Sequence, residues 1–367
     1  MGYGPEFLKW KSEVTDSALK AVADLYHAFQ TGLMLTISLK RGAKDAGVWT
    51  KALFRRQHKA KFLSSFEKLG LKELSDAKAA AAYHYLSNKI GGVDVEYMAE
   101  SESKAWVRFP PPRWIYPDAS ICGIPTEVSR GMLEGWYAEN GPSLQNSGLG
   151  FVCTAQTPDA QHGLAGYFLD YGRELSTDER LIFRPGELPP PFDPDKAPEL
   201  PTEKWPQDRL DKAYRNYAME YVRTGLPLLT ELFGPSDGGH LGRHTGFLIG
   251  AQLYQKVIRG LSLKRYANGA LGLATLIKIL GDAEGALTSA SGDIDNAQVQ
   301  WDSWRLGRGM NQPHPAVFEA WHGLIEGLAA SHDRFLIVEL VASPATGDDH
   351  IEWRIRRRRI NKKEGLN

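Results

Sequence analysis

The chain is poor in cysteine and has no excess charge of either sign, and both facts narrow its class. Its 367 residues include only two cysteines, Cys122 and Cys153, which is too few for a disulfide framework and typical of a reducing compartment. Lys plus Arg and Asp plus Glu are 44 each, so no global field would gather nucleic acid or an anionic membrane. We therefore expect neither as a partner.

Long apolar runs and familiar catalytic signatures are also missing. No run approaches the ~18 apolar residues of a spanning helix, and the first residues lack the order of a signal peptide, so we expect a cytoplasmic protein. The sequence contains no Walker-type phosphate loop, no HExxH, no G-x-S-x-G and no paired CxxC. Nucleotide hydrolysis and standard zinc proteolysis lose their support, and no cofactor or metal-ligand set is indicated.

The most informative positive feature is internal repetition. Residues 51–109 align without a gap with residues 243–301, and the matched positions keep their order and their apolar pattern. The matches are Leu69 with Leu261, Ala105 with Ala297, Val107 with Val299, Arg113 with Arg305 and, after small shifts, Glu134 and Trp136 with Glu319 and Trp321, and Asp178, Leu181 and Arg184 with Asp348, Ile351 and Arg354. This pattern predicts a tandem duplication.

A proline-rich segment separates the two copies. Eight prolines lie among acidic residues between Arg184 and Pro206, and proline removes backbone donors and favours extended geometry. We therefore expect a first repeat over 1–184, a linker without regular structure over 185–206, and a second repeat over 207–367.

Hydrophobic periodicity predicts the same elements in each copy. Apolar residues at three and four spacing predict helices over 17–39, 51–69, 76–89 and 132–137, and again over 208–232, 243–261, 268–280 and 316–330. Alternation predicts strands at 93–97, 105–109, 297–301, 335–342 and 350–356. Each repeat thus reads helices, two strands, a helix and two strands. We expect an α+β fold with an antiparallel sheet, helices on one face, and a pseudo-twofold relation between the repeats.

The element order, with a closing strand, a Gly-Asp turn and the strand Ile351-Glu352-Trp353-Arg354-Ile355, resembles the 4-vinyl-reductase domain and the related 2-aminothiazoline-4-carboxylate hydrolase-like proteins. The resemblance implies the fold and a ligand pocket between helices and sheet. Such domains often carry a cysteine pair near the last two strands, whereas here only Cys153 lies in such a strand and Val338 is its counterpart, so no zinc site is carried over. The family includes both small-molecule sensors and enzymes.

The segment from Ser236 to His244 is the most suggestive for chemistry. Asp237 can cap a following helix, whose first amide hydrogens are electropositive. His240 and His244 are one helical turn apart, with Arg243 beside them, so together they could hold a carboxylate and carry a proton. The alternative is that the two histidines are surface or packing residues.

The repeat comparison sharpens this hypothesis. His240 and His244 correspond to Val48 and Ala52, whereas Arg243 corresponds to Lys51, so the cation recurs and the imidazoles do not. Residues needed for one site need not recur in both copies. Gly242, Gly246 and Gly250 form a separate helix face, which lets a neighbouring backbone approach closely.

Aromatic residues and one further arginine complete the expected site. Trp301 and Arg305 follow the second copy's strand, while Trp114 and Tyr116 lie in residues 110–129, which we interpret as an insertion of the first copy together with residues 157–178. Long aromatic loops are costly to order unless they cover something. They either close over a pocket or seal the interface between the copies.

These features favour an enzyme that acts on a small carboxylated or otherwise anionic organic molecule by hydrolysis or proton transfer. His240 and His244 would be catalytic, and the substrate-binding residues would be Arg243, Trp301, Arg305, Trp114 and Tyr116. One alternative is a non-catalytic small-molecule sensor or binding protein. Another is a metal- or haem-dependent oxidoreductase that uses His240 or His244. The cofactor stays unknown, and a homo-oligomer stays open.

Overall fold

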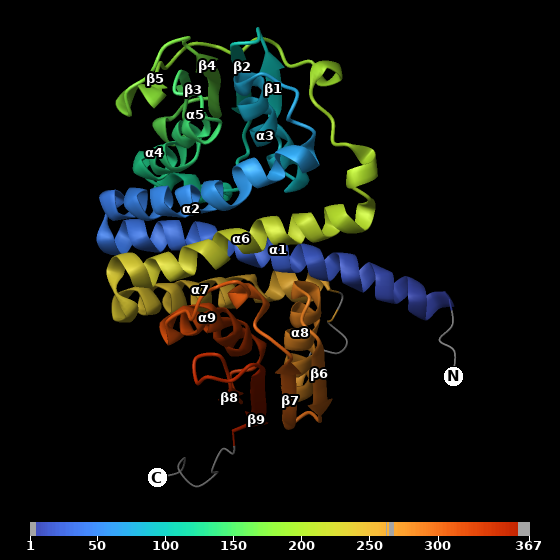
Figure 1. Cartoon of the computed structure of the whole chain (residues 1–367). Helices are drawn as coiled ribbons and strands as arrows, with labels where there is room; N and C mark the ends of the chain where they lie inside the picture. The colour runs from blue at the N-terminus through green and yellow to red at the C-terminus, as the bar shows by residue number, and fades with distance from the viewer. Residues whose placement is uncertain (1–4, 262, 264–267, 359–367) are drawn as a thin grey trace. The chain divides into compact units, whose positions relative to one another are not determined.

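The chain forms two compact units whose boundaries lie inside long helices. The structure is a computed structural model that describes residues 5–261, 263 and 268–358, with residues 5–15 described by their backbone alone. One unit is Leu33–Leu228, and the other joins the residues up to Gly32 with those from Leu229 onward. Their boundaries fall in α1 (Pro5–Arg41) and α6 (Gln207–Phe233), shown in Figure 1, rather than in the proline-rich segment.

The unit Leu33–Leu228 contains a five-stranded sheet. Its helices are α2 (Ala43–Leu69), α3 (Asp76–Ile90), α4 (Thr126–Gly135) and the short α5 (Asn140–Ser143). Its strands are β1 (Glu96–Ala99), β2 (Lys104–Phe109), β3 (Leu149–Ala155), β4 (Leu164–Asp170) and β5 (Leu181–Phe183), in the order β1-β2-β4-β3-β5. All neighbours are antiparallel except β5, which pairs parallel to β3. Helix α3 packs against β1, β2 and β4.

The other unit repeats this plan around a four-stranded sheet. Its helices are α7 (Pro235–Gly260), α8 (Gly269–Glu284) and α9 (Pro315–His332). Its strands are β6 (Thr288–Gly292), β7 (Asn296–Trp301), β8 (Leu336–Ala342) and β9 (Ile351–Arg357), all antiparallel in the order β6-β7-β9-β8. Helix α8 packs against β6, β7 and β9, and Trp301, Trp321 and Trp353 are fully buried in this core.

The α+β class and the antiparallel sheets are confirmed. Both sheets follow the same path, since β1-β2-β4-β3 corresponds to β6-β7-β9-β8. Both also carry a register shift in the same strand, between Cys153 and Ala155 in β3 and between Leu340 and Ala342 in β8. Within each sheet the matched pair Val107 and Val299 occupies the same place on β2 and β7.

Two parts of the sequence alignment are wrong. Residues 157–178 are not an insertion, because they contain β4, which forms the central hairpin with β3. Leu181 therefore corresponds to nothing in β9; it belongs to the extra edge strand β5. The register shift also makes Leu340, not Val338, the counterpart of Cys153. The error arose because β4 is buried on both faces along its first five residues and so lacks the alternation that marks a half-exposed strand.

The proline-rich segment, residues 185–206, explains that double burial. It has no strand and no α-helix, only 3-10 turns at Pro194–Lys196 and Thr202–Lys204, as its composition predicts. Phe192 packs against a cluster of Met98, Trp106, Val152 and Tyr167. Successive strand residues point to opposite faces, so this cluster lies on the sheet face away from α3. In the second sheet the corresponding face carries exposed glutamines at 298 and 300.

Glycine fixes where α2 and α7 begin and how closely α7 packs. Gly42 and Gly234 precede these helices at φ +94° and +84°, a region that favours glycine. Helix α7 therefore starts at Pro235, earlier than the expected cap at Asp237. The expected close approach is confirmed, because a Cβ at Gly250 would lie 2.2 Å from the Leu324 carbonyl oxygen of α9.

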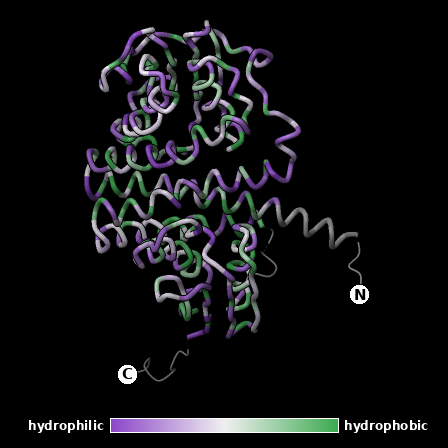
Figure 2. The backbone as a smooth tube through the Cα atoms, in the orientation of Figure 1, coloured by the Kyte–Doolittle hydropathy of each residue, from purple (hydrophilic) through white to green (hydrophobic). Residues whose placement is uncertain are grey.

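Hydrophilic and hydrophobic residues alternate along the long helices in Figure 2. This mixture is typical of helices that bury one face and expose the other. None of the helices within the described residues combines the length and apolar character needed to cross a membrane.

Candidate functional site

A cavity of about 450 Å³ lies within the unit Leu33–Leu228. Its volume is in the range of small-molecule sites. Helices α2 and α6 supply residues on two sides, α3 supplies a third, and the turn after β2 and the end of α4 complete the wall. The lining includes the aromatic, polar and charged residues Phe54, Gln57, Lys61, Tyr83, His84, Asn88, Arg113, Trp114, Trp136, Tyr217, Glu220 and Tyr221.

Arg113 is the most unusual residue of this wall. Three prolines end β2 just before it, because proline cannot donate to a strand ladder. The residue is only 6% exposed, and its Nε is buried without an acceptor anywhere in the described part of the chain. Its guanidinium carbon lies 4.8 Å from the Phe109 ring centre and 5.9 Å from that of Tyr116. A buried cation with aromatic neighbours and no carboxylate partner is ready to accept an anion.

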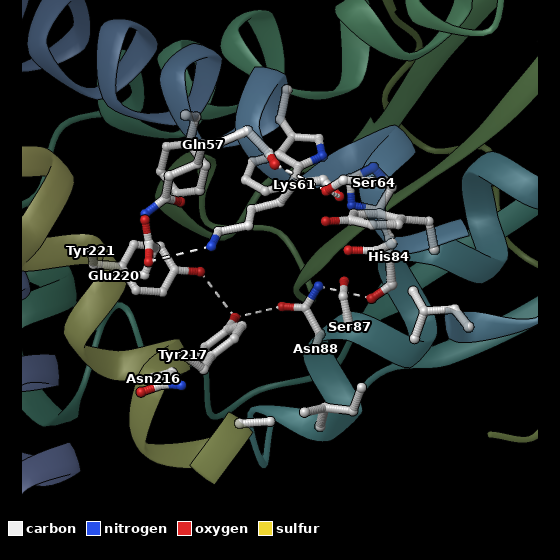
Figure 3. Close-up of a pocket in the computed structure, with 18 of the residues that line it drawn as sticks. Gln57, Lys61, Ser64, His84, Ser87, Asn88, Asn216, Tyr217, Glu220 and Tyr221 are labelled. Atoms are coloured by element: carbon white, nitrogen blue, oxygen red, sulfur yellow. Dashed lines mark hydrogen bonds and ion pairs between the residues drawn. The ribbon is translucent and has the colours of Figure 1, made fainter. Parts of the chain in front are cut away.

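A chain of hydrogen bonds crosses the cavity wall, as Figure 3 shows. The Tyr221 hydroxyl donates to the Tyr217 hydroxyl at 3.0 Å, and the Tyr217 hydroxyl donates to the Asn88 side-chain oxygen at 2.8 Å. The Asn88 amide nitrogen in turn donates to the His84 carbonyl oxygen at 2.8 Å. The chain fixes the tyrosine rings, which come from α6, against α3.

Burial moves the pKa values of these groups away from neutrality. Burial, and to a lesser degree the nearby His58, lowers the pKa of His84 well below its ordinary value, so the imidazole is neutral. Burial raises the pKa of Tyr217 to about 12 and raises that of Tyr221 well above its ordinary value. At neutral pH these groups are a weak base and weak acids, and they act as fixed hydrogen-bonding dipoles rather than as proton carriers.

The remaining charges of the wall lie nearer to solvent. Lys61, whose side chain is about half exposed, lies 3.6 Å from the Glu220 carboxylate, as the dashed line in Figure 3 marks. Lys68 and Arg209 also line the cavity, and Glu220 is the single carboxylate among the lining residues. The cavity as a whole therefore carries net positive charge, which favours anions over cations.

Four polar side chains of this wall have apolar counterparts in the other unit. In the alignment that places Val107 on Val299, the counterparts of Gln57, Lys61, His84 and Asn88 are all apolar. These counterparts are Ile249, Leu253, Leu276 and Leu280. The two sheets share one strand path without these four polar side chains in common, so the shared strand path does not require them.

Arg113 and Arg305 recur, but their surroundings differ. Arg305 lies 3.3 Å from the Asp302 carboxylate, whereas the residue that corresponds to Asp302 in the first repeat is Pro110. Arg305 is thus partly buried and paired with a carboxylate, although its Nε is also buried without an acceptor in the described part of the chain. Arg113 is more deeply buried and has no carboxylate partner within the described residues.

The residues of the expected α7 site lie in the other unit and face solvent. His240 and His244 are exposed, with ring centres 6.1 Å apart. Arg243 forms a two-point ion pair with Glu326 of α9, at 2.9 and 2.7 Å. Lys51 makes the matching bridge to Glu134 of α4 at 2.8 Å, so a contact between helices accounts for the cation that recurs.

The expected aromatic residues are divided between the units. Trp301 is fully buried in the core against Trp321 and Trp353. Trp114 lines the cavity, with its ring centre 4.8 Å from that of Tyr221. Tyr116 is buried beside Arg113. The structure thus brings Trp114 to the cavity, and Tyr116 lies beside Arg113 without lining the cavity. It places Trp301 and Arg305 in the unit of the second sheet.

Sequence reasoning missed Arg113, Gln57, Trp136 and the two tyrosines of α6 as site residues. One signal was present in the alignment: Arg113 recurs as Arg305, but Pro110 replaces the acidic partner Asp302. The tyrosines gave no signal, because Tyr217 and Tyr221 lie far along the chain, in a helix that belongs by sequence to the second repeat.

No family model matches the chain, and no curated protein matches it in sequence. The resemblance to 4-vinyl-reductase domains therefore stays a prediction. Within the described residues, no group of three or more His, Cys, Asp or Glu side chains is placed to hold a metal ion.

Proposed function

We propose that the protein binds a small organic anion in the cavity of the unit Leu33–Leu228. The single observation that carries this proposal is Arg113, a buried guanidinium in the cavity wall without a protein counter-ion among the described residues. An unpaired buried charge is costly, and a bound anion would compensate it. The aromatic side chains around it would bury the apolar body of the ligand.

Binding, rather than acid–base catalysis, is the function that these side chains support. A general acid or base works best with a pKa near the working pH. Burial instead lowers the pKa of His84 and raises the pKa of Tyr217, so both move away from neutral pH. His240 and His244 are exposed on α7 and do not line this cavity. The hydrolytic reaction expected from the sequence is therefore the narrower hypothesis, and turnover of a bound anion would support it.

Two matched arginine variants test the proposal. Isothermal titration calorimetry with pairs of organic acids and their neutral amides should show binding of acids and at least about tenfold weaker binding of amides. Arg113→Met should weaken acid binding by at least about tenfold, whereas Arg305→Met, which removes the same charge at the matching position, should not. Equal affinity for acids and amides, or an unchanged Arg113→Met variant, would contradict the proposal.

We also propose that the chain arose by tandem duplication. The common strand path, the shared register shift, and the matching glycines Gly42 and Gly234 support this history. The pseudo-twofold relation between the copies stays a prediction.

A further inference from the structure

Three buried N–H donors of the cavity wall have no acceptor in the described part of the chain. They are Gln57 Nε2, Arg113 Nε and Trp136 Nε1. No acceptor oxygen of a lining residue is left in the same condition. Unpaired buried donors destabilise a fold, and they are rare unless something else satisfies them. A ligand that offers acceptors and no donors fits this wall.

The charge of the wall selects one kind of acceptor. Lys61 already faces Glu220, so Arg113 is the one deeply buried cation of the lining that lacks a counter-ion within the described residues. A carboxylate carries one negative charge and offers about four acceptor sites on two oxygens. Its planar geometry also matches the planar guanidinium fork. A phosphate would bring more than one negative charge beside a single deeply buried cation.

Aromatic rings surround the same space. The ring centre of Trp136 lies 6.1 Å from that of Phe54 in an edge-to-face arrangement and 6.0 Å from that of Tyr83 in a stacked arrangement. Trp114 lies 4.8 Å from Tyr221 on the α6 side. All five side chains line the cavity. Aromatic rings prefer other aromatic rings in stacked or edge-to-face geometry over saturated groups of the same size.

We infer that the ligand is a planar aromatic carboxylate, whose carboxylate oxygens accept from the Arg113 side of the wall and whose ring packs among the cavity's aromatic side chains. This inference rests on the proposed function and narrows it to one chemical class. Gln57 and Trp136 supply the remaining donors to ring or carboxylate acceptors.

The test uses 2-naphthoate as a probe on the full chain, with three matched compounds. Decahydro-2-naphthoate keeps the carboxylate but saturates the rings, 2-naphthamide removes the charge, and 2-naphthyl phosphate enlarges it. Calorimetry should rank 2-naphthoate tightest, with the saturated acid about fivefold weaker. The amide and the phosphate should each be at least about tenfold weaker.

Variants of the donors add a readout that a purely structural role would not change. Trp136→Phe keeps a ring and deletes one N–H, so it should weaken 2-naphthoate by about three- to tenfold while leaving 2-naphthamide affinity less affected. Gln57→Leu should act in the same direction. Gln300→Leu, at an exposed position of β7 outside the cavity lining, serves as the control and should leave 2-naphthoate affinity unchanged.

Each result separates this inference from the proposed function. If the saturated acid binds as tightly as 2-naphthoate, the aromatic class is wrong but the binding of organic anions stands. If 2-naphthyl phosphate binds more tightly than 2-naphthoate, the assignment of a carboxylate as the anionic group is wrong. If benzoate, 2-naphthoate and indole-2-carboxylate all fail to bind at millimolar concentration while aliphatic acids bind, the inference of an aromatic ligand is wrong and the proposed binding of organic anions stands. If no organic acid binds better than its amide, the proposed function fails as well.

Discussion

Replacing Arg113 by methionine should make the ligand-free protein more stable, although most substitutions at buried positions destabilise. In the wild-type protein Arg113 is 6% exposed, its Nε is buried, and it has no ion-pair partner within the described residues. Methionine keeps much of the aliphatic stem, adapts to irregular space, and packs well against aromatic rings. It removes the unpaired charge and the orphan donor together.

The size of the gain follows from two opposing contributions. An unsatisfied buried donor costs about 1–3 kcal/mol, and more when it is charged. The contacts of the guanidinium with the Phe109 and Tyr116 rings, at 4.8 and 5.9 Å, offset part of that cost, by about 0.5–2 kcal/mol. Because this donor is charged, its cost lies at about 3 kcal/mol, so the net expectation for Arg113→Met is a rise of about 1–2 kcal/mol in the free energy of unfolding. For a unit of this size, that raises Tm by about 2–8 °C.

A bound ligand should make the wild-type protein more stable than the Arg113→Met variant. A bound anion stabilises the wild-type protein by about 2.7 kcal/mol at a hundredfold excess over Kd, and it should stabilise the variant hardly at all. Thermal unfolding followed by circular dichroism, with and without 2-naphthoate, would show the two proteins exchange rank. Arg305→Met provides the control, since it breaks a partly exposed ion pair with Asp302 and should lose no more than about 1 kcal/mol in either condition.

The reasoning is refuted if Arg113→Met lowers the free energy of unfolding by more than about 1 kcal/mol without ligand. Such a loss would mean that the guanidinium has stabilising partners in the folded chain. The cavity would then lack a vacant cation, and the proposed function would lose the observation that carries it.

Three further predictions concern packing and pH. Gly250→Ala should destabilise the folded protein by about 1–3 kcal/mol in chemical denaturation, because its Cβ would lie 2.2 Å from a backbone oxygen of α9. Gly260→Ala is the control and should be nearly neutral, because a Cβ there would have no neighbouring atom within 4 Å. Burial lowers the pKa of His58 to about 4, so the folded state binds its proton less readily, and stability should fall as pH drops from about 6.5 toward 4; His58→Phe should flatten that part of the pH profile. Burial alone would raise the pKa of Glu326, but hydrogen bonds from a histidine and from Arg243 outweigh it and lower the pKa to about 2. Its contribution should be complete above about pH 5 and lost as pH falls toward 2, and Arg243→Met should reduce that loss in acid titrations of stability.

Much of the fold could be predicted from the sequence because it depends on local periodicity. The helices expected over 51–69, 76–89 and 316–330 occur as α2, α3 and α9. Helix α2 begins eight residues earlier than expected, at 43 instead of 51, and the other ends differ by at most two residues. The strands expected over 335–342 and 350–356 occur as β8 and β9 because one face of their sheet meets α8 while the other meets solvent. Alternation in the sequence records that asymmetry directly.

The first sheet departed from prediction where tertiary packing removed the alternation. Strand β4 is buried on both sides, by α3 on one face and by the cluster that includes Phe192 on the other, so its sequence reads as an apolar run. Its role as the central partner of β2 and β3 depends on pairing with residues distant in the chain. No local pattern carries that information.

The candidate site depended even more on tertiary structure. The sequence drew attention to His240 and His244, since two histidines one turn apart form a visible local pattern, but both are exposed on α7. The cavity instead joins Arg113, in a turn after β2, with Tyr217, from a helix about a hundred residues later. What the sequence determined by itself was the α+β class, the helices and several of the strands, because each of these elements follows from short-range spacing. Which side chains share a cavity, and which cation lacks a partner, was decided only when residues far apart in the chain packed together and excluded water.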